Sequence, residues 1–216
     1  MIEEQTPAAG SIEEEPGLRR TPSQKRSRER VENILSCAIR LIEEKGSDAM
    51  RMSEVAAMAG ISIGSLYQYF PDKAAIVRTL AERYNAASRD CIASEFAKVT
   101  TLAELRCAFS ALFDTYYDMF LAEPVMRDIW SAMQADKTLR KLELAESRAN
   151  GCLLAETWAR VQPGTPRERI DDAAFLIMHL GECTMRVAVS VDRPEGGRIV
   201  AAYKHMILRE FVADAT

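Results

Sequence analysis

Few residues of this sequence have the type and spacing that chemistry at a site requires. The chain has two histidines, and one of them, His179, stands three and four positions before Glu182 and Cys183. These residue types ligate transition metals, and their spacing would place all three on one face of a helix. The alternative is a core histidine beside a polar partner. We favour this alternative and predict no metal site.

Residue sets for catalysis are missing from the sequence. It contains no Ser/His/Asp group, no paired-carboxylate motif and no glycine-rich phosphate loop, so we expect neither an enzyme nor a bound cofactor. The five cysteines are scattered and never form a CxxC pair. This pattern argues against a disulfide framework and a zinc ribbon, and we interpret the cysteines as small buried side chains.

A second group of residues, within 52–73, points to a helix-turn-helix. Ala56 supplies the small residue that is needed where two short helices cross, and Gly60 tolerates the positive φ of a tight turn. Val55, Ile61 and Leu66 stand where apolar anchors to a core are required. Each feature is weak by itself, but together they predict two crossed helices.

The elements around this group are all predicted to be helical. The sequence Thr21-Pro22-Ser23-Gln24 is typical of a helix start, and Gly46 is expected to end that first helix. Short helices follow at about 53–59 and 62–70, and Asp72 is a suitable cap for a long fourth helix. Further breaks are expected at 123–124, near 136, at 162–164 and at 192–194. Nothing alternates with a period of two, so the fold is predicted to be all-α, without an internal repeat.

The segment GISIGSLYQYFPDK, residues 60–73, resembles the signature of the TetR/AcrR (tetracycline-repressor) family. The preceding helix and SEVAAMAG are similar to that family's amino-terminal half, so the resemblance covers residues 25–80. It implies an N-terminal three-helix helix-turn-helix DNA-binding domain followed by a helical-bundle ligand-binding and dimerisation domain. We place a disordered acidic tail at 1–20, the helix-turn-helix domain at 21–71 and the effector-binding and dimerisation domain at 72–216.

The resemblance implies that the second helix of the motif enters the major groove of double-stranded DNA. Gln68 is able to pair bidentately with adenine, Ile63 could contact thymine methyl groups, and Gly64 would allow close approach of the backbone. The predicted DNA-binding residues are Arg51, Ser53, Ser62, Ile63, Gly64, Ser65, Tyr67, Gln68, Tyr69 and Lys73.

Several of these residues are interpreted as contacts to phosphate rather than to bases. Tyr67, Tyr69 and Lys73 are expected to position the protein on the DNA backbone, although aromatic residues at this spacing are often core. Arg51 offers a cation to the phosphates, and Ser53 is then the expected helix cap or a further groove contact. The basic segment 19–30 is either a DNA-contacting arm or a solvated helix end.

The resemblance also implies an effector pocket among the later helices. The candidate lining residues are bulky and mostly aromatic or methionine: Phe113, Tyr116, Tyr117, Met126, Trp130, Met133, Trp158, Phe175 and Met178. Plain core packing is the alternative for each of them. A lining of this kind would favour a flat or lipophilic small-molecule effector.

A homodimer is expected to form through two helices at the end of the chain. The helix at about 166–190 mixes small residues with apolar ones, which suits close packing between subunits, and the last helix has an apolar stripe. The small residues are Ala173, Ala174, Gly181, Thr184 and Ala188. The stripe consists of Ile199, Val200, Tyr203, Met206, Ile207 and Phe211.

The net charge of −4 is unevenly distributed. Residues 1–16 carry five carboxylates and no base, whereas residues 17–83 carry twelve Lys and Arg against eight Asp and Glu. A local basic module on an acidic body fits a DNA-reading domain better than a general nucleic-acid coat. The acidic start is no secretory signal, and no apolar run approaches the ~20 residues of a membrane span, so a cytoplasmic protein without a membrane partner is expected.

These expectations combine into one functional hypothesis. The dimer is expected to bind a palindromic operator as a repressor, and a small molecule would release it by displacing the fourth helix. The alternative is a helix-turn-helix DNA-binding protein that senses no small molecule and acts through a protein partner.

Overall fold

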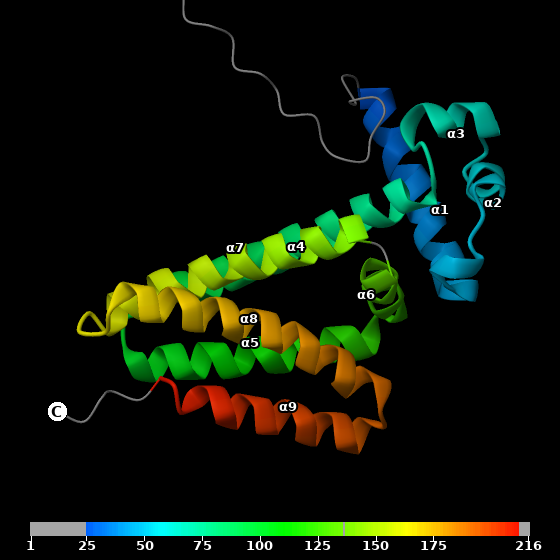
Figure 1. Cartoon of the computed structure of the whole chain (residues 1–216). Helices are drawn as coiled ribbons and strands as arrows, with labels where there is room; N and C mark the ends of the chain where they lie inside the picture. Colours follow the sequence, from blue (N-terminus) through cyan, green and yellow to red (C-terminus); the bar gives the residue numbers. More distant parts are fainter. Residues whose placement is uncertain (1–24, 136, 212–216) are drawn as a thin grey trace, which may run out of the picture.

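The computed structural model describes residues 25–135 and 137–211, without the side chains of residues 133–139. This part consists of helices joined by short turns and contains no strand, which confirms the all-α prediction (Figure 1). The predicted acidic tail and the helix start at Thr21 lie outside the described residues. The helices are α1 Lys25–Ala49, α2 Met52–Met58, α3 Ile63–Tyr69, α4 Lys73–Ala97, α5 Leu102–Ala122, α6 Pro124–Ala135, α7 Lys137–Val161, α8 Arg167–Ser190 and α9 Arg193–Leu208.

Helix α1 is interrupted where the sequence predicts its end. Gly46 has φ 85° and ψ 156°, a conformation that side chains other than glycine rarely adopt, and one further turn follows it. The buried stripe of α1 includes Ile34, Leu35 and Ile42. The opposite face is polar, and the described part of the basic segment, Lys25–Arg30, is almost entirely exposed. Amphipathic periodicity therefore orients α1 toward the core.

The first of two hydrophobic cores joins the helix-turn-helix to α1, α4 and α6. Leu66, Phe70 and Ile76 are completely buried there, together with Ile129 of α6. The core thus continues past residue 71 into the first turns of α4. As a result α6, which is distant in sequence, packs directly beneath the head formed by α1–α3 (Figure 1).

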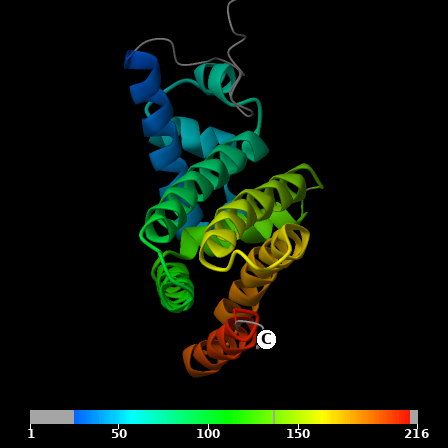
Figure 2. The same ribbon diagram turned by 90° about the vertical axis from the view of Figure 1, so that its left-hand side faces the viewer.

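The second core holds α5, α7, α8 and α9 to the carboxy-terminal half of α4. Leu105, Phe109, Leu154 and Met185 are at most 1% exposed in it. The contact between α7 and α8 is the most extensive in the chain. Figures 1 and 2 show the head at one end of the molecule and α8 and α9 toward the other, with the long helix α4 leading from the head into the bundle.

Helix α8 turns three of its five small residues inward, which corrects for these three the expectation that they face a partner subunit, whereas Ala173 and Thr184 are half-buried. Ala174 and Ala188 are fully buried, and an added Cβ at Gly181 would overlap the Phe113 ring. The stripe of α9 likewise packs within the chain, except Met206, which is 65% exposed. What α8 presents to solvent is a set of larger apolar residues, namely Leu176, Leu180 and Val187.

The apolar character of α8 gives a second finding. Among the described residues, Arg167–Ser190 is long and apolar enough to cross a membrane by length and composition, with a mean hydropathy of 1.2 in its best window. Core helices of soluble proteins pass the same test, and α8 packs along α7 and α9. The expectation that no segment has membrane-like composition was therefore too strong.

Candidate nucleic-acid interface and ligand cavity

The helix-turn-helix has the geometry that its sequence predicts. Ala56 is 3% exposed at the crossing of α2 and α3, and Gly60 has φ 67° in the turn. The amide of Ile61 donates to the carbonyl oxygen of Ala56 at 3.0 Å. Asn33 of α1 adds a contact that sequence reasoning missed, because its Nδ2 donates to the Ala59 carbonyl oxygen at 3.0 Å. The turn is therefore fixed to α1 as well as to itself.

Helix α3 presents one polar and aromatic face to solvent. Ile63 and Tyr67 are each 42% exposed, and Gly64 and Gln68 are exposed beside them. The spacing of these residues is that of a single helical face. Of the residues predicted to reach DNA, these four are the ones whose side chains or backbone stand free on the outer face of α3.

Tyr69 corrects the sequence-based interpretation. It was expected to face outward with Tyr67, but it is only 5% exposed and belongs to the first core. The cause is helical geometry: Tyr69 lies three residues after the buried Leu66 and directly before Phe70, so it shares their inward face. Tyr67 and Tyr69 are two positions apart, which places them on nearly opposite sides of the helix.

The serines and Arg51 at the helix starts have structural roles in part. Ser62 caps α3, since its Oγ accepts from the Ser65 amide at 3.1 Å, and its hydroxyl also donates to Ser65 Oγ. Ser53 is not the cap of α2, contrary to expectation, because α2 already begins at Met52. Arg51 occupies the cap position, and its backbone amide donates to the carboxylate of Glu54 at 3.0 Å. Both Arg51 and Ser53 remain exposed.

Lys73 is engaged within the protein, which corrects its interpretation as a free phosphate contact. Its Nζ donates to the carbonyl oxygens of Ser47 and Asp48, both at 2.9 Å. On the other side of Ser47, the Asp128 carboxylate of α6 accepts from the Ser47 amide at 2.9 Å and from its hydroxyl. The end of α1 is thus clamped between α4 and α6, with Asp72 capping α4 as predicted.

A cavity of about 160 Å³ lies between α4, α5, α7 and α8. Its wall is mostly apolar, but each of the four helices contributes one polar residue, and two tyrosines also line it. The lining residues are Tyr84, Ala87, Ser88, Cys91, Ile92, Phe96, Phe109, Leu112, Phe113, Thr115, Tyr116, Met119, Asn150, Met178, Gly181 and Glu182. An engineered cavity of about 150 Å³ accepts benzene, so one ring with a short substituent is the scale of molecule that fits.

Three of the predicted pocket residues line this cavity, namely Phe113, Tyr116 and Met178. For four of the others, Tyr117, Met126, Trp130 and Trp158, the alternative of core packing holds. Trp130 packs edge-on against Phe120, and Trp158 packs edge-on against Phe211.

The remaining predicted residues do not line the cavity, and each has different neighbours. Tyr117 is buried with its hydroxyl 3.4 Å from the Arg193 carbonyl oxygen, and Met126 belongs to the first core. Phe175 stacks on His179 and lies under the Arg148 guanidinium, 4.5 Å from its ring centre. The side chain of Met133 lies outside the described residues. Whether a bulky residue lines the cavity therefore depends on which face of its helix it occupies, and its size alone does not decide this.

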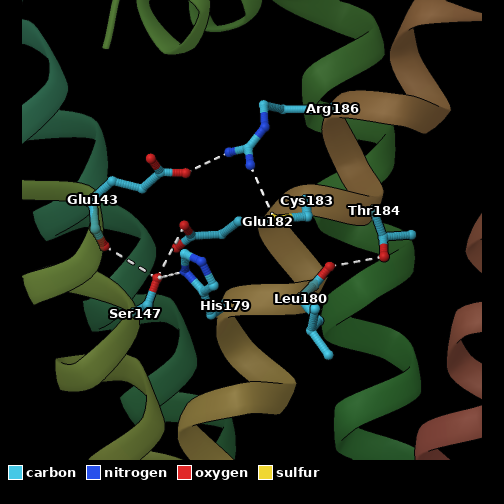
Figure 3. A network of polar contacts seen from close by, with 8 residues as sticks. All are labelled: Glu143, Ser147, His179, Leu180, Glu182, Cys183, Thr184 and Arg186. Atoms are coloured by element: carbon cyan, nitrogen blue, oxygen red, sulfur yellow. Dashed lines mark hydrogen bonds and ion pairs between the residues drawn. The ribbon is translucent and has the colours of Figure 1, made fainter. Parts of the chain in front are cut away.

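A polar seam lies between α7 and α8 (Figure 3), and of its residues only Glu182 lines the cavity. The Ser147 hydroxyl lies 3.1 Å from each of three groups: the Glu143 carbonyl oxygen, Glu182 Oε2 and His179 Nδ1. A hydroxyl has one proton, so it can donate to only one of them and must accept from another. Arg186 pairs with the Glu143 carboxylate and donates to Cys183 Sγ.

The seam separates the three residues that the sequence suggested as metal ligands. His179 and Glu182 converge on Ser147, whereas Cys183 contacts Arg186 (Figure 3). Within the described part of the chain, no group of three or more His, Cys, Asp or Glu side chains is arranged to hold a metal ion. His179 is instead a histidine beside a polar partner.

Comparison with known families covers both halves of the molecule. The model for bacterial regulatory proteins of the tetR family matches residues 34–80, and the model for the tetracyclin repressor-like C-terminal domain matches residues 103–215. The second match alone spans more than half of the chain. The protein belongs to the TetR family. Its helix-turn-helix is therefore a DNA-binding element, and the protein is a transcriptional regulator.

Individual relatives of this TetR-family regulator agree with the assignment. The HTH-type transcriptional regulator BetI of Burkholderia thailandensis is 30% identical over 155 residues, which cover 67% of this chain and 75% of BetI. Two solved structures share the fold at lower identity. A SmeT–triclosan complex has a TM-score of 0.65 at 19% identity and covers 87% of this chain and 93% of its own. FadR from Bacillus subtilis with stearoyl-CoA has a TM-score of 0.58 at 14% identity, covering 86% and 99%.

The electrostatics of this TetR-family cavity centre on Glu182. Burial and, next, the neighbouring Glu143 carboxylate raise the pKa of its carboxyl, while the Ser147 hydrogen bond and Arg186 lower it, and the resulting pKa is about 8. Burial, followed by the charge of Glu182, also raises the pKa of Tyr116 well above its ordinary value. At neutral pH, Glu182 is therefore mostly a neutral acid in the empty cavity.

Sequence reasoning missed the α4 side of the cavity. Tyr84, Ser88 and Cys91 recur at helical spacing on α4, so the sequence could have grouped them on one face. The predicted pocket residues were instead the bulky side chains, and Ser88 and Cys91 are small. Asn150 carried no signal that distinguishes it from a surface amide, although it is only 8% exposed. These residues make α4 both a wall of the cavity and the continuation of the DNA-binding motif.

Proposed function

We propose that this regulator is a homodimeric repressor that a compact, mainly apolar effector releases from a palindromic operator. One observation carries this proposal: α4 lines the cavity with Tyr84, Ser88 and Cys91, and its first residue follows α3 after only a short turn at 70–72. A ligand that shifts α4 therefore acts directly on the element that positions the recognition helix. The cavity's apolar wall supports the lipophilic character of the effector.

Base recognition is assigned to the outer face of α3. Gln68 is proposed to pair with adenine and Ile63 to contact thymine methyl groups, while Gly64 would allow the backbone of α3 to approach the groove closely. Tyr67 is assigned to phosphate. Arg51 and Ser53, which are exposed at the start of α2, are proposed as further contacts to the DNA backbone, whereas Ser62 and Ser65 mainly cap α3.

The exposed face of α8 is proposed as the centre of the dimer interface. Leu176, Leu180 and Val187 are 51%, 48% and 52% exposed in the single chain, and they follow one another along the helix. A second copy would bury them, which would remove apolar surface from water at both subunits. Two recognition helices would then meet successive major grooves about 34–36 Å apart.

Effector binding is proposed to change this separation. The end of α1 is joined to α6 through Asp128 and to α4 through Lys73, so the head follows both helices as one unit. An effector that fits one position of α4 better than the other favours that conformer by the difference in its affinities. Coupling of about 1–3 kcal/mol, which is typical of allosteric proteins, would lower operator affinity about 5- to 150-fold.

The experiment begins with operator selection from genomic fragments, followed by fluorescence anisotropy of the selected duplex with and without compact lipophilic compounds. Ser88→Leu should fill part of the cavity from α4 and make operator binding insensitive to compounds that release the wild type. Ser94→Leu is the matched control, because Ser94 is exposed on α4 and does not line the cavity. If no compound releases the wild type or either variant from the selected operators, the result would favour a regulator that acts through a protein partner.

The dimer has its own test. Leu180→Glu places a charge in the proposed interface and should convert the protein from two-chain to one-chain mass by light scattering, with loss of operator binding. Ala111→Glu, on the exposed face of α5, should leave the mass unchanged. A wild-type mass of one chain at micromolar concentration contradicts the dimer.

A further inference from the structure

The charges around the polar seam do not balance when Glu182 is ionised. Three carboxyl groups meet there, those of Glu143, Glu146 and Glu182. Two guanidinium groups neutralise two of these carboxylates, because Arg186 pairs with Glu143 and Arg89 of α4 pairs with Glu146. Glu182 is left without a cationic partner, although it is 6% exposed. A buried carboxylate in this position needs one positive charge from elsewhere or must hold a proton.

The cavity offers acceptors where that charge would be placed. Glu182 is the only carboxyl group among the lining residues, and no lysine or arginine is among them. Asn150 also lines the cavity, and its Oδ1 is buried with no hydrogen-bond donor in the described part of the chain. Unsatisfied buried acceptors are uncommon because each costs desolvation energy. A ligand that brings several donors and a positive charge would satisfy both residues.

We propose that the effector is an amphiphilic monocation, whose ammonium-type head pairs with Glu182 and Asn150 while its apolar body lies against the aromatic wall. This inference rests on the proposed function, because it specifies the ligand of the same cavity. An ammonium group has three donors and no acceptor, which matches the Glu182 carboxylate and the unsatisfied Asn150 Oδ1. Phe109 and Phe113, whose ring centres are 4.6 Å apart, supply the surface for the body of the ligand.

Proton release is the signature of such a complex. With a pKa of about 8, Glu182 holds a proton for most of the time at pH 7 in the empty cavity, and an adjacent ammonium group would expel it. The other groups that face Glu182 are Tyr116 from α5, Glu143 and Glu146 from α7, and His179 and Arg186 from its own helix.

The probes are 2-phenylethylammonium, the neutral 2-phenylethanol and the anionic 3-phenylpropanoate, which differ little in shape but differ in charge. Isothermal titration calorimetry in buffers of different ionisation enthalpy measures both the affinity and the number of protons released. Wild type should bind the ammonium most tightly and release close to one proton at pH 7. Its affinity should rise roughly tenfold per pH unit between pH 6 and 7 and level off above pH 8.

Glu182→Gln keeps the shape of the side chain and removes its charge. It should weaken ammonium binding at least about tenfold, abolish proton release, and change the affinity for phenylethanol less than about threefold. Retained phenylethanol binding shows that the variant's cavity is intact. His179→Gln and the exposed Glu156→Gln should leave ammonium binding and proton release unchanged.

The outcomes separate this inference from the proposed function. Equal affinities of the ammonium and the alcohol, tighter binding of the carboxylate, or full ammonium binding by Glu182→Gln would each overturn the cationic effector. Loss of proton release in His179→Gln would do so as well. Release of the operator by phenylethanol alone leaves the proposed function standing without the cation. Ammonium binding through Glu182 that leaves operator affinity unchanged supports the inference and contradicts the proposed function.

Discussion

Between pH 4.5 and about 8 the folded and unfolded chains differ in the protonation of Glu182. The unfolded chain ionises this carboxyl near its ordinary pKa of 4.5, whereas burial keeps it protonated in the folded chain until about pH 8. Unfolding in this interval therefore releases a proton, and the free energy of unfolding falls as pH rises. The contribution is fully present below pH 4.5 and is lost at about 1.4 kcal/mol per pH unit, roughly 5 kcal/mol in total.

Glu182→Gln removes this titration and little else, because glutamine retains an oxygen for the Ser147 contact. The stability difference between the wild type and this variant should therefore shift against the wild type by about 4 kcal/mol between pH 5 and pH 8. All other titrating groups are common to both proteins and cancel in the difference. Glutamine should make the protein more stable at pH 8, although the substitution lies in the core.

Urea unfolding, followed by circular dichroism at a fixed protein concentration and at pH 5, 6, 7 and 8, measures the effect. Fixed concentration matters because dimerisation would contribute to stability. Glu156→Gln is the control, since Glu156 is exposed on the same helix as Ser147. Its stability difference from the wild type should not vary with pH. Parallel pH profiles for wild type and Glu182→Gln would show that Glu182 is ionised in the folded protein and would refute the argument.

Four further substitutions test the packing of α9 and the clamp at the end of α1. Gly196→Ala should lower the free energy of unfolding by about 1–3 kcal/mol, because a Cβ there would overlap the Ala188 carbonyl oxygen. The Cβ of Gly197→Ala meets no atom within 4 Å, so this substitution should stabilise α9 by about 0.5–1 kcal/mol. Thermal unfolding of both variants and the wild type measures the difference. Asp128→Ala should cost about 1–3 kcal/mol and weaken operator binding, as measured by urea unfolding and anisotropy. Lys73→Ala should lower stability by about 1 kcal/mol without changing the dependence of DNA affinity on salt, and a flatter salt dependence would restore the phosphate contact that the sequence suggested.

The helix-turn-helix was predictable because its determinants are local. A glycine with positive φ, a small residue four positions before it and apolar anchors at helical spacing are contained in about twenty consecutive residues, and the structure places each as expected. The same periodicity also contained the correction for Tyr69. That residue lies on the face of Leu66, so a stricter use of the helical repeat would have assigned it to the core.

The cavity was less predictable because it depends on how four helices cross. Phe113, Tyr116 and Met178 were identified among bulky residues, but Trp130 and Trp158 fill core positions beside other rings. A cavity exists where side chains stop short of one another, and residue size on one helix does not indicate the space left by its neighbours. For this reason helical spacing could group Tyr84, Ser88 and Cys91 on one face of α4 but could not show that this face borders a cavity.

The role of Glu182 depends on tertiary contacts that helical spacing alone does not predict. Spacing correctly grouped it with His179 and Cys183 on one side of α8, which made a metal site conceivable. The facing helix then decides the chemistry: α7 brings Ser147 to two of these residues, while Arg186 takes the third. A metal needs converging ligands, and this arrangement separates them. Glu182 therefore remains a buried acid beside an apolar cavity, without an ion pair to a basic side chain. A positively charged ligand in the cavity would supply the missing charge.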